Sequence, residues 1–340
     1  MRILITVDPE IPVPPQLYGG IERIVDILVR GLRKRGHDVG LVANGKSTTS
    51  ASELFPWWGR RSQNQLDTVK NTILLWSIVQ RFRPDIIHSF SRIFYLLPWL
   101  GSPLPKIMSY QRDPSYRTTS WAVKLSGNSL KFTGCSRYIC DLGKRSGGNW
   151  YPIHNCVELE KYTFNPTVSQ DSPLVFLSRV EKIKGAHTAI QIALKTGHPL
   201  IIAGNHNPDD PYWQREILPH INNNGQIQYI GPVNDQQKNH LLGQAKAMIV
   251  PIEWEEPFGI VFAEALACGT PVISCPRGAL PEIIRPGVDG YLINSIEEGC
   301  QAVQKLNHIH RVNCRQRVEE YFASDVIVEQ YEQLYKVHLS

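Results

Sequence analysis

With 340 residues, the chain is too long for one ordinary compact core and suits two domains of ordinary size. Hydrophobic residues make up 42% and charged residues 20%, which excludes a disordered protein. The net charge of +5, without a basic run, gives no indication of nucleic-acid binding and fits either an ordinary solvated surface or contact with anionic ligands or lipids.

The seven cysteines are scattered, and no CxxC pair or Cys/His cluster has the spacing of metal ligands. We therefore expect reduced thiols, a reducing compartment and no bound metal. The chain enters a strand-like run at Ile3 without the charged head and apolar core of a signal peptide. No apolar stretch approaches the roughly 18 residues that span a bilayer. These features predict a cytoplasmic protein that would meet a membrane only from its surface.

The first half of the chain alternates short β-branched runs with helical periodicity, which is typical of βαβ units around a parallel sheet. Residues 3–7 are the first predicted strand, and a proline-rich loop leads from it to Gly19 and Gly20. Apolar residues then recur at the spacing of one helix face over 21–32, and Gly36 closes that helix. Further strands are predicted at residues 39–42, 85–88, 106–110 and 132–135.

Residues 151–155 and 165–173 predict a connection to a second α/β series. Two doubly wound domains in tandem place a cleft between the carboxyl ends of their strands, where open α/β sheets bind ligands. The chain is expected to end in a helix. The second series comprises strands at 174–178, 200–203, 227–230, 247–250 and 272–274, and helices at 186–195, 213–221, 236–245 and 259–268.

The segment from Glu255 to Gly269 is the most informative stretch. Glu256 precedes a helix that starts near Phe258, and Glu264 lies about a turn and a half inside it. The start of such a helix presents free N–H groups and partial positive charge, which suits a diphosphate. A carboxylate on the same helix can accept two hydrogen bonds from a ribose. A solvated Glu264 on an amphipathic helix fits the spacing equally well.

Arg179 and Lys184 follow a strand and precede a helix in the same predicted domain. In a cleft, two cations five residues apart could neutralise a departing diphosphate, and such preorganised charge usually makes the largest contribution to catalysis when an activated group is transferred. Surface basic residues on a turn are the ordinary alternative.

Together these segments resemble glycosyltransferase family 4, whose members adopt the GT-B fold of two facing Rossmann-like, doubly wound domains. The resemblance covers nearly the whole chain. It rests on Glu256-Pro257-Phe258-Gly259 with Glu264, on Arg179 with Lys184-Gly185, on Gly19-Gly20-Ile21-Glu22 within the segment 14–22, on residues 152–157 with Cys156 where glycine is usual, and on residues 278–283.

The resemblance implies a catalytic role for Arg179 and Lys184, which would hold the donor phosphates, and for Glu256. Glu264 would hold the ribose. The transferred sugar and its phosphate would be contacted by Glu256 and the amides of Phe258, Gly259 and Ile260, while Gly19 and Gly20 would let their loop approach the diphosphate.

Three residues of the first half have open roles. The family often carries a histidine facing the donor sugar after the strand at 106–110, but this chain has Gln111, which can hydrogen-bond and cannot titrate. His88 ends a strand and could contact the sugar or acceptor, and a structural histidine fits equally well.

The resemblance implies retention of configuration. An inverting enzyme would need a side-chain base, for which Asp113 is the candidate, although an aspartate before proline is more often a turn residue.

The resemblance also assigns the domains. Residues 1–154 would form the acceptor-side domain, residues 155–322 the domain that binds the nucleotide sugar, and a helix at 323–340 would pack back on the first. The nucleotide-diphosphate sugar is then a substrate, and no cofactor or metal is required.

No sequence motif identifies the donor or the acceptor. UDP-glucose is favoured as a common donor and GDP-mannose comes next, while the acceptor is a small molecule, an oligosaccharide or a lipid-linked sugar. A nucleotide-sugar epimerase of the same fold and a non-catalytic nucleotide-sugar or glycan-binding protein are the alternatives.

A dehydrogenase is disfavoured, because eleven residues separate Val7 from Gly19 and no GxGxxG follows the first strand. Trp57-Trp58 beside Arg60-Arg61 could meet lipid headgroups, stack on sugars or pack beneath a loop.

Overall fold

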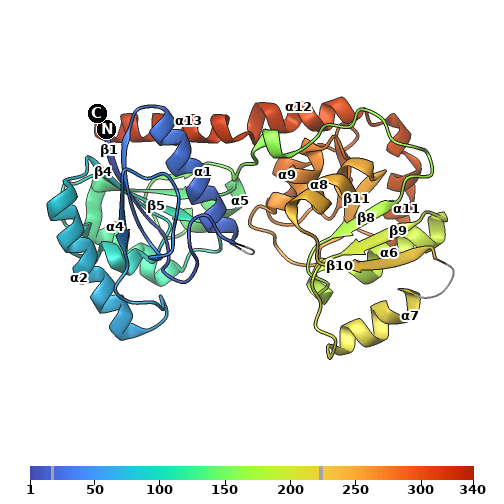
Figure 1. The fold of residues 1–340 in the computed structure, drawn as a ribbon, viewed down its shortest axis with the longest axis horizontal. Helices are drawn as coiled ribbons and strands as arrows, with labels where there is room; N and C mark the ends of the chain where they lie inside the picture. The colour runs from blue at the N-terminus through green and yellow to red at the C-terminus, as the bar shows by residue number, and fades with distance from the viewer. Residues whose placement is uncertain (17–18, 222–224) are drawn as a thin grey trace. The chain divides into compact units, whose positions relative to one another are not determined.

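A computed structural model describes residues 1–16, 19–221 and 225–340. The chain forms two compact units: residues 1–156 with 324–340, and residues 157–323. Each unit has its own parallel sheet, of seven strands in the first and six in the second. The predicted pair of doubly wound α/β domains is therefore confirmed (Figure 1).

The sheet of the first unit has the order β3-β2-β1-β4-β5-β6-β7, and all its pairs are parallel. The chain starts in the middle and winds outward in both directions, which leaves a switch point beside β1. Its central strands are buried on both faces, as expected for a parallel sheet covered by helices. The strands are β1 (Arg2–Thr6), β2 (Asp38–Ala43), β3 (Glu53–Pro56), β4 (Ile86–Ser89), β5 (Lys106–Tyr110), β6 (Leu130–Gly134) and β7 (Trp150–Pro152).

The helices of this unit divide between the two faces of the sheet according to the right-handed rule for crossovers. The step from β1 to β2 carries α1 (Gly20–Lys34), while the steps in the opposite direction carry α2 (Gln65–Phe82), α3 (Leu97–Leu100), α4 (Tyr116–Ser126) and α5 (Arg137–Lys144). Helix α2 touches α3, α3 touches α4, and they share one apolar core with the sheet.

The last helix, α13 (Ser324–Leu339), packs beside α1 in the first unit (Figure 1). Tyr331 and Tyr335 on its inner face are buried. The buried Glu332 forms an ion pair of 3.0 Å with Arg35 and a hydrogen bond of 3.0 Å with His37, both just after α1. Apolar contacts and charge pairing therefore tie the end of the chain to its beginning.

The second unit is a six-stranded parallel sheet of order β10-β9-β8-β11-β12-β13. Its strands are β8 (Leu174–Leu177), β9 (Leu200–Ala203), β10 (Ile227–Gly231), β11 (Ala247–Val250), β12 (Val272–Ser274) and β13 (Gly290–Leu292). Its helices are α6 (Ala186–Thr196), α7 (Leu218–Ile221), α8 (Asp235–Gln244), α9 (Ile260–Ala267), α10 (Leu280–Ile283), α11 (Ile296–Gln304) and α12 (Arg311–Tyr321), and the predicted helix at 213–221 starts with a π-helical turn, Trp213–Ile217.

Candidate functional site: the carboxyl edge of the second sheet

Three loops meet at the edge of the second sheet where the central strands end. They follow β8, β11 and β12 and span residues 178–185, 251–259 and 275–279. The amide of Glu253 donates to the carbonyl of Ile183 at 2.8 Å, and the amide of Ala279 donates to the carbonyl of Glu256 at 2.8 Å. These two hydrogen bonds hold the loop after β11 between the loop after β8 and the loop after β12.

Two glycines permit this close packing of backbones. Gly185 has a φ of +75°, and a Cβ there would lie 2.0 Å from the carbonyl oxygen of Pro251. Gly278 has a φ of +56°, and a Cβ there would lie 2.2 Å from the carbonyl oxygen of Glu256. Any side chain would push the loops apart, so both positions require glycine.

Lys184 and Glu256 form a buried ion pair at this edge. Lys184 Nζ lies 2.8 Å from Glu256 Oε2, and the two side chains are only 11% and 13% exposed. The indole N–H of Trp254 donates to the same oxygen at 3.1 Å, and the lysine Nζ lies 4.4 Å from the Trp254 ring centroid. The carboxylate and the ring thus hold the ammonium group in one place.

Arg179 lies in the same loop as Lys184 but is half exposed. Its guanidinium pairs with Glu181 at 2.7 Å, on a carboxylate that is itself 39% exposed. An exposed pair of this kind contributes little to stability, so the guanidinium is free to exchange this partner for another anion.

Helix α9 begins at Ile260, directly after Gly259, which has a φ of +80°. Gly259 has no side chain to cap the first turn, so the leading amides can serve an anion. Phe258 is buried and packs edge-to-face on Phe322, with ring centroids 5.7 Å apart. Its side chain therefore anchors the turn, and only its backbone could face a ligand.

Glu264 lies one turn inside α9 and is buried at 6% exposure. Its Oε1 accepts hydrogen bonds from the Tyr162 hydroxyl at 2.6 Å and from Lys238 Nζ at 2.7 Å. Both contacts reach the same carboxylate oxygen, which leaves Oε2 for another donor. A solvated Glu264 is thereby excluded. Sequence reasoning missed Tyr162 and Lys238, because neither belongs to the segment around α9.

In the first unit, Gly19 caps the start of α1, and Gly20 is the first residue of that helix. A Cβ on Gly19 would lie 2.6 Å from Cβ of Pro15 and 2.8 Å from Oε2 of Glu22, so the bend admits glycine alone. Residues 17 and 18 of the matched segment lie outside the described residues.

His88 is fully buried inside β4. Its Nδ1 lies 2.6 Å from the hydroxyl of Tyr335 and its Nε2 lies 2.6 Å from the hydroxyl of Ser109. Burial lowers the pKa of His88 to about 3, so the ring is neutral. This geometry corrects the expectation of a sugar contact: His88 joins α13 to the sheet. Gln111 is partly exposed and Asp113 is exposed, both directly after β5.

A pocket of about 810 Å³ opens at the ends of β1, β2 and β3 in the same unit. Glu10, Asn44, Lys46 and Arg60 are among its lining residues. Beside Glu10, Asp8 has one carboxylate oxygen that is buried without a hydrogen-bond partner in the described structure. Burial, assisted by Glu10 and opposed by Arg112 and Arg92, raises the pKa of Asp8 to about 6. Sequence reasoning missed this pair, and its only signal was two carboxylates just after the first strand.

Asp8→Asn is expected to stabilise the protein at neutral pH. The pKa of Asp8 is raised from 3.8 to about 6 in the folded state, so ionisation of Asp8 destabilises the folded protein. This destabilisation is absent below pH 3.8 and complete above pH 6. The variant should gain roughly 2–3 kcal/mol at pH 7.5, and this gain should shrink towards pH 4.5. Urea denaturation at the two pH values measures the difference. The exposed Asp113→Asn is the matched control, and equal gains at both pH values would contradict the assignment.

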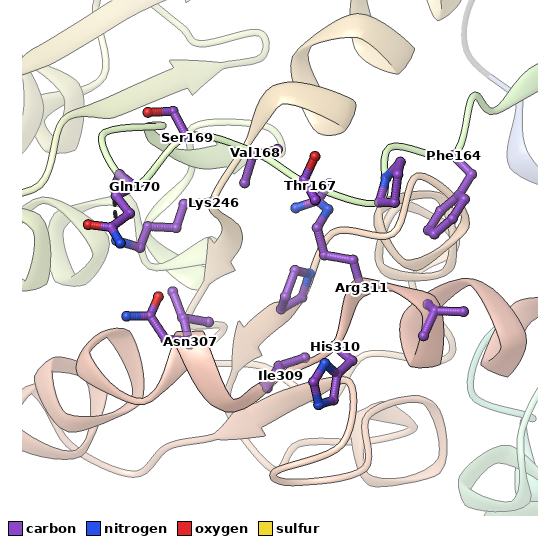
Figure 2. A pocket seen from close by; sticks show the side chains of 14 residues that line it. Phe164, Thr167, Val168, Ser169, Gln170, Lys246, Asn307, Ile309, His310 and Arg311 are labelled. Carbon is purple, nitrogen blue, oxygen red and sulfur yellow. Dashed lines mark hydrogen bonds between the residues drawn. The ribbon is translucent and has the colours of Figure 1, made fainter.

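Another hollow, of about 490 Å³, lies at the opposite edge of the second sheet, where its strands begin (Figure 2). Lys246 there donates to the backbone of Gln170 at 3.0 Å. The Arg311 guanidinium is committed to structure, because it donates to the carbonyls of Asn165, Ala245 and Gly243 at 2.7–3.1 Å. This hollow contains none of the predicted site residues.

Family models account for almost all of the chain. The model described as "Glycosyltransferase Family 4" matches residues 18–161, and the model "Glycosyl transferases group 1" matches residues 162–321. The chain belongs to glycosyltransferase family 4. This membership makes the protein an enzyme, a glycosyltransferase, and confirms the resemblance seen in its sequence.

Two relatives show how far the sequence similarity extends. The enzyme is 24% identical, over 95% of its length and 97% of the relative, to an uncharacterised 42.6 kDa protein of the cps region of Klebsiella pneumoniae. It is 29% identical to N-acetyl-alpha-D-glucosaminyl L-malate synthase of Bacillus anthracis, over 48% of its own length and 44% of that protein, so this match spans less than half of the synthase.

The fold is shared with solved structures. The Anabaena protein Alr3699/HepE, crystallised with UDP and glucose, superposes with a TM-score of 0.72 at 19% identity, over 99% of this chain and 100% of that one. This likeness confirms the GT-B fold of the family 4 enzyme. Within residues 1–16, 19–221 and 225–340, no helix is both long and apolar enough to cross a bilayer.

Proposed function

We propose that the enzyme transfers a hexose from a nucleotide-diphosphate sugar, with UDP-glucose favoured over GDP-mannose, and retains the configuration of the anomeric carbon. The observation that carries the proposal is the Lys184–Glu256 ion pair at the carboxyl edge of the second sheet. Glu256 lies in the loop that leads into the uncapped helix α9, and Glu264 lies one turn inside that helix. In this proposal Glu256 contacts the sugar, Lys184 and the helix amides contact the diphosphate, and Glu264 contacts the ribose.

In this proposal the donor binds the second unit. Lys184, Arg179 and the amides at Gly259 and Ile260 hold the two phosphates, because preorganised positive charge suits a diphosphate. Oε2 of Glu264 accepts hydrogen bonds from the ribose hydroxyls, while Tyr162 and Lys238 keep Oε1 in place. Glu256 both positions Lys184 and presents its carboxylate to the sugar.

The reaction breaks the bond between the anomeric carbon and the diphosphate oxygen, and that oxygen keeps the electron pair. The acceptor hydroxyl attacks from the face that the diphosphate leaves, and its proton passes to a departing phosphate oxygen. Lys184 and Arg179 stabilise the negative charge that develops on the diphosphate. The proposal requires no metal ion or cofactor, because these cations supply the neutralising charge.

The first unit would hold the acceptor. The pocket of about 810 Å³ beside Glu10 is large enough for a sugar-sized group and combines carboxylate, amide and cationic lining residues. Gln111 and Asp113 also belong to the loop that follows β5. An acceptor carrying hydroxyl groups fits that lining, whether it is a small molecule, an oligosaccharide or a lipid-linked sugar.

Support for UDP-glucose comes from a structural neighbour. The Anabaena protein Alr3699/HepE has been crystallised both with UDP and glucose and with UDP-glucose. The fold of that protein is shared with this chain over nearly the full length of both.

A thermal-unfolding screen of nucleotide sugars tests the proposal. A true donor at 100 times its dissociation constant should add roughly 2.7 kcal/mol to the stability of the protein. We expect UDP-glucose and UDP to raise the midpoint and GDP-mannose and GDP to raise it less. If no nucleotide sugar changes the midpoint at millimolar concentration, the donor site is wrongly placed.

Glu264→Gln should weaken UDP binding, because an ionic hydrogen bond to a ribose hydroxyl contributes about 1.5–3 kcal/mol. The change keeps the size of the side chain and its contact with Tyr162. Calorimetric titration with UDP should therefore give a dissociation constant raised by about tenfold to a hundredfold. The exposed Glu297→Gln in the same unit is the control. Equal affinities in wild type and Glu264→Gln would remove Glu264 from the site.

The products separate the two alternative functions. An epimerase would convert the free nucleotide sugar without releasing a nucleotide, and a binding protein would leave it unchanged. The Lys184–Glu256 pair would serve a binding protein as well, because the diphosphate is anionic before transfer. Formation of a glycosylated acceptor together with release of the nucleotide is therefore the observation that separates transfer from binding.

A further inference from the structure

Helix α2 is apolar on both of its faces. Its inner residues, among them Leu75 and Phe82, join the core of the first unit. Its outer face should be polar in a helix that covers a sheet. Instead it exposes large apolar side chains at helical spacing: Leu66 at 73%, Val69 at 52%, Ile73 at 55% and Trp76 at 50%.

The apolar surface continues on neighbouring segments. Trp121 and Leu125 are exposed on the outer side of α4, which covers the same face of the sheet as α2. Phe94, in the turn that α2 and α4 both touch, is exposed as well. Trp58, just before α2, is 60% exposed, whereas its neighbour Trp57 is buried. We call these exposed residues the outer apolar surface: Trp58, Leu66, Val69, Ile73, Trp76, Phe94, Trp121 and Leu125.

The segment that carries this surface is strongly basic. Residues 57–131 contain eleven lysines and arginines, three aspartates and no glutamate, while the whole chain has a net charge of only +5. Exposed basic side chains flank the apolar ones on the helices themselves: Lys70 on α2, and Arg117 and Lys124 on α4. Arg60 and Arg61 lie in the loop before α2 and are exposed as well.

The three aspartates of this segment offset only part of that charge, and two of them are hydrogen-bonded to backbone amides. Oδ2 of Asp67 accepts hydrogen bonds from the backbone amides of Arg60 and Arg61 at 3.0 and 3.1 Å. Oδ2 of Asp85 accepts from the amide of Arg2 at 2.7 Å. Both carboxylates therefore serve the backbone.

We propose that the outer apolar surface docks on an anionic lipid bilayer, with its aromatic and aliphatic side chains in the headgroup region and the flanking lysines and arginines on lipid phosphates. A surface that is apolar, rich in tryptophan and bordered by basic residues has the composition that interfacial binding requires. A second copy of this chain fits poorly, because a twofold interface would place the same basic segment against itself. This proposal does not depend on the identity of the donor.

Co-sedimentation with vesicles tests the proposal. We expect the full chain to bind vesicles containing phosphatidylglycerol at least tenfold more tightly than pure phosphatidylcholine vesicles, and to be released by high salt. Ile73→Ser with Trp76→Ser should reduce binding at least tenfold. Arg61→Glu with Lys70→Glu should reduce it further, since each basic residue contributes about fivefold at an anionic surface.

Val337→Ser is the matched control, because Val337 is 61% exposed on α13, the helix beside α1. It should bind vesicles like the wild type. Circular dichroism measures whether the variants fold. If the serine variant does not fold, vesicle binding by the charge-reversal variant tests the proposal. Absence of binding to any vesicle would overturn the proposal. A dimer in light scattering that Ile73→Ser with Trp76→Ser dissociates would assign the surface to self-association instead.

Discussion

Lys184→Ala is expected to lower the turnover number by about a hundredfold or more. Its ammonium group is fixed by Glu256 and Trp254 at the carboxyl edge of the second sheet, where the diphosphate is proposed to depart. A preorganised charge partner of this kind contributes roughly 2.7–4 kcal/mol to the transition state. Turnover with saturating UDP-glucose measures the loss, and Arg179→Ala should show a loss of the same kind.

A control is needed because removing Lys184 leaves Glu256 buried without its partner, and breaking such a pair can cost about 3–5 kcal/mol of stability. The double variant Lys184→Ala with Glu256→Ala removes both charges, so it should fold more stably than Lys184→Ala and remain equally inactive. Lys182→Ala, an exposed lysine in the same loop, should have normal turnover. A folded Lys184→Ala protein within a few-fold of wild-type turnover would show that the pair is structural.

Tyr335→Ala is expected to destabilise the first unit by about 3–5 kcal/mol, the cost of removing a fully buried aromatic side chain. The change also removes the hydroxyl that lies 2.6 Å from Nδ1 of His88. A loss of this size is a large part of the stability of an ordinary domain. Urea denaturation of the full chain, followed by intrinsic fluorescence, measures it.

Two variants of the same helix separate the contributions. Tyr335→Phe keeps the ring and should cost about 1–3 kcal/mol, because it leaves a buried imidazole nitrogen without its partner. Val337→Ala, at an exposed position, should stay within about 0.5 kcal/mol of wild type. If Tyr335→Ala were as stable as Val337→Ala, α13 would not hold the first unit together.

The parallel sheets could be predicted from the sequence because their strands are short apolar runs between glycine and polar turns. The strands at 106–110, 200–203, 247–250 and 272–274 have the predicted ends. Helix α2 was not predicted. Since it is apolar on both faces, it lacks the one-sided periodicity by which a helix is recognised, and the same property suggested the lipid surface.

The candidate site could be predicted only where its residues are neighbours in the chain. Arg179, Lys184, Glu256 and Glu264 lie in loops or helices that directly follow strands, so their common edge follows from the alternation of the fold. Tyr162 and Lys238 reach Glu264 from distant segments, and no local pattern reports that contact. The burial of His88 depends on α13, which follows it by more than 230 residues.

Transfer of glucose from UDP-glucose to methanol tests the central proposal most directly, because a methyl glucoside cannot interconvert its anomers. Proton NMR of the reaction mixture should show UDP and methyl α-D-glucoside appearing in equal amounts, with Lys184→Ala slower by about a hundredfold. A methyl β-D-glucoside, together with an inactive Asp113→Asn variant, would mean that the enzyme inverts and that Asp113 is the base. A new nucleotide sugar without release of UDP would mean that the protein is an epimerase.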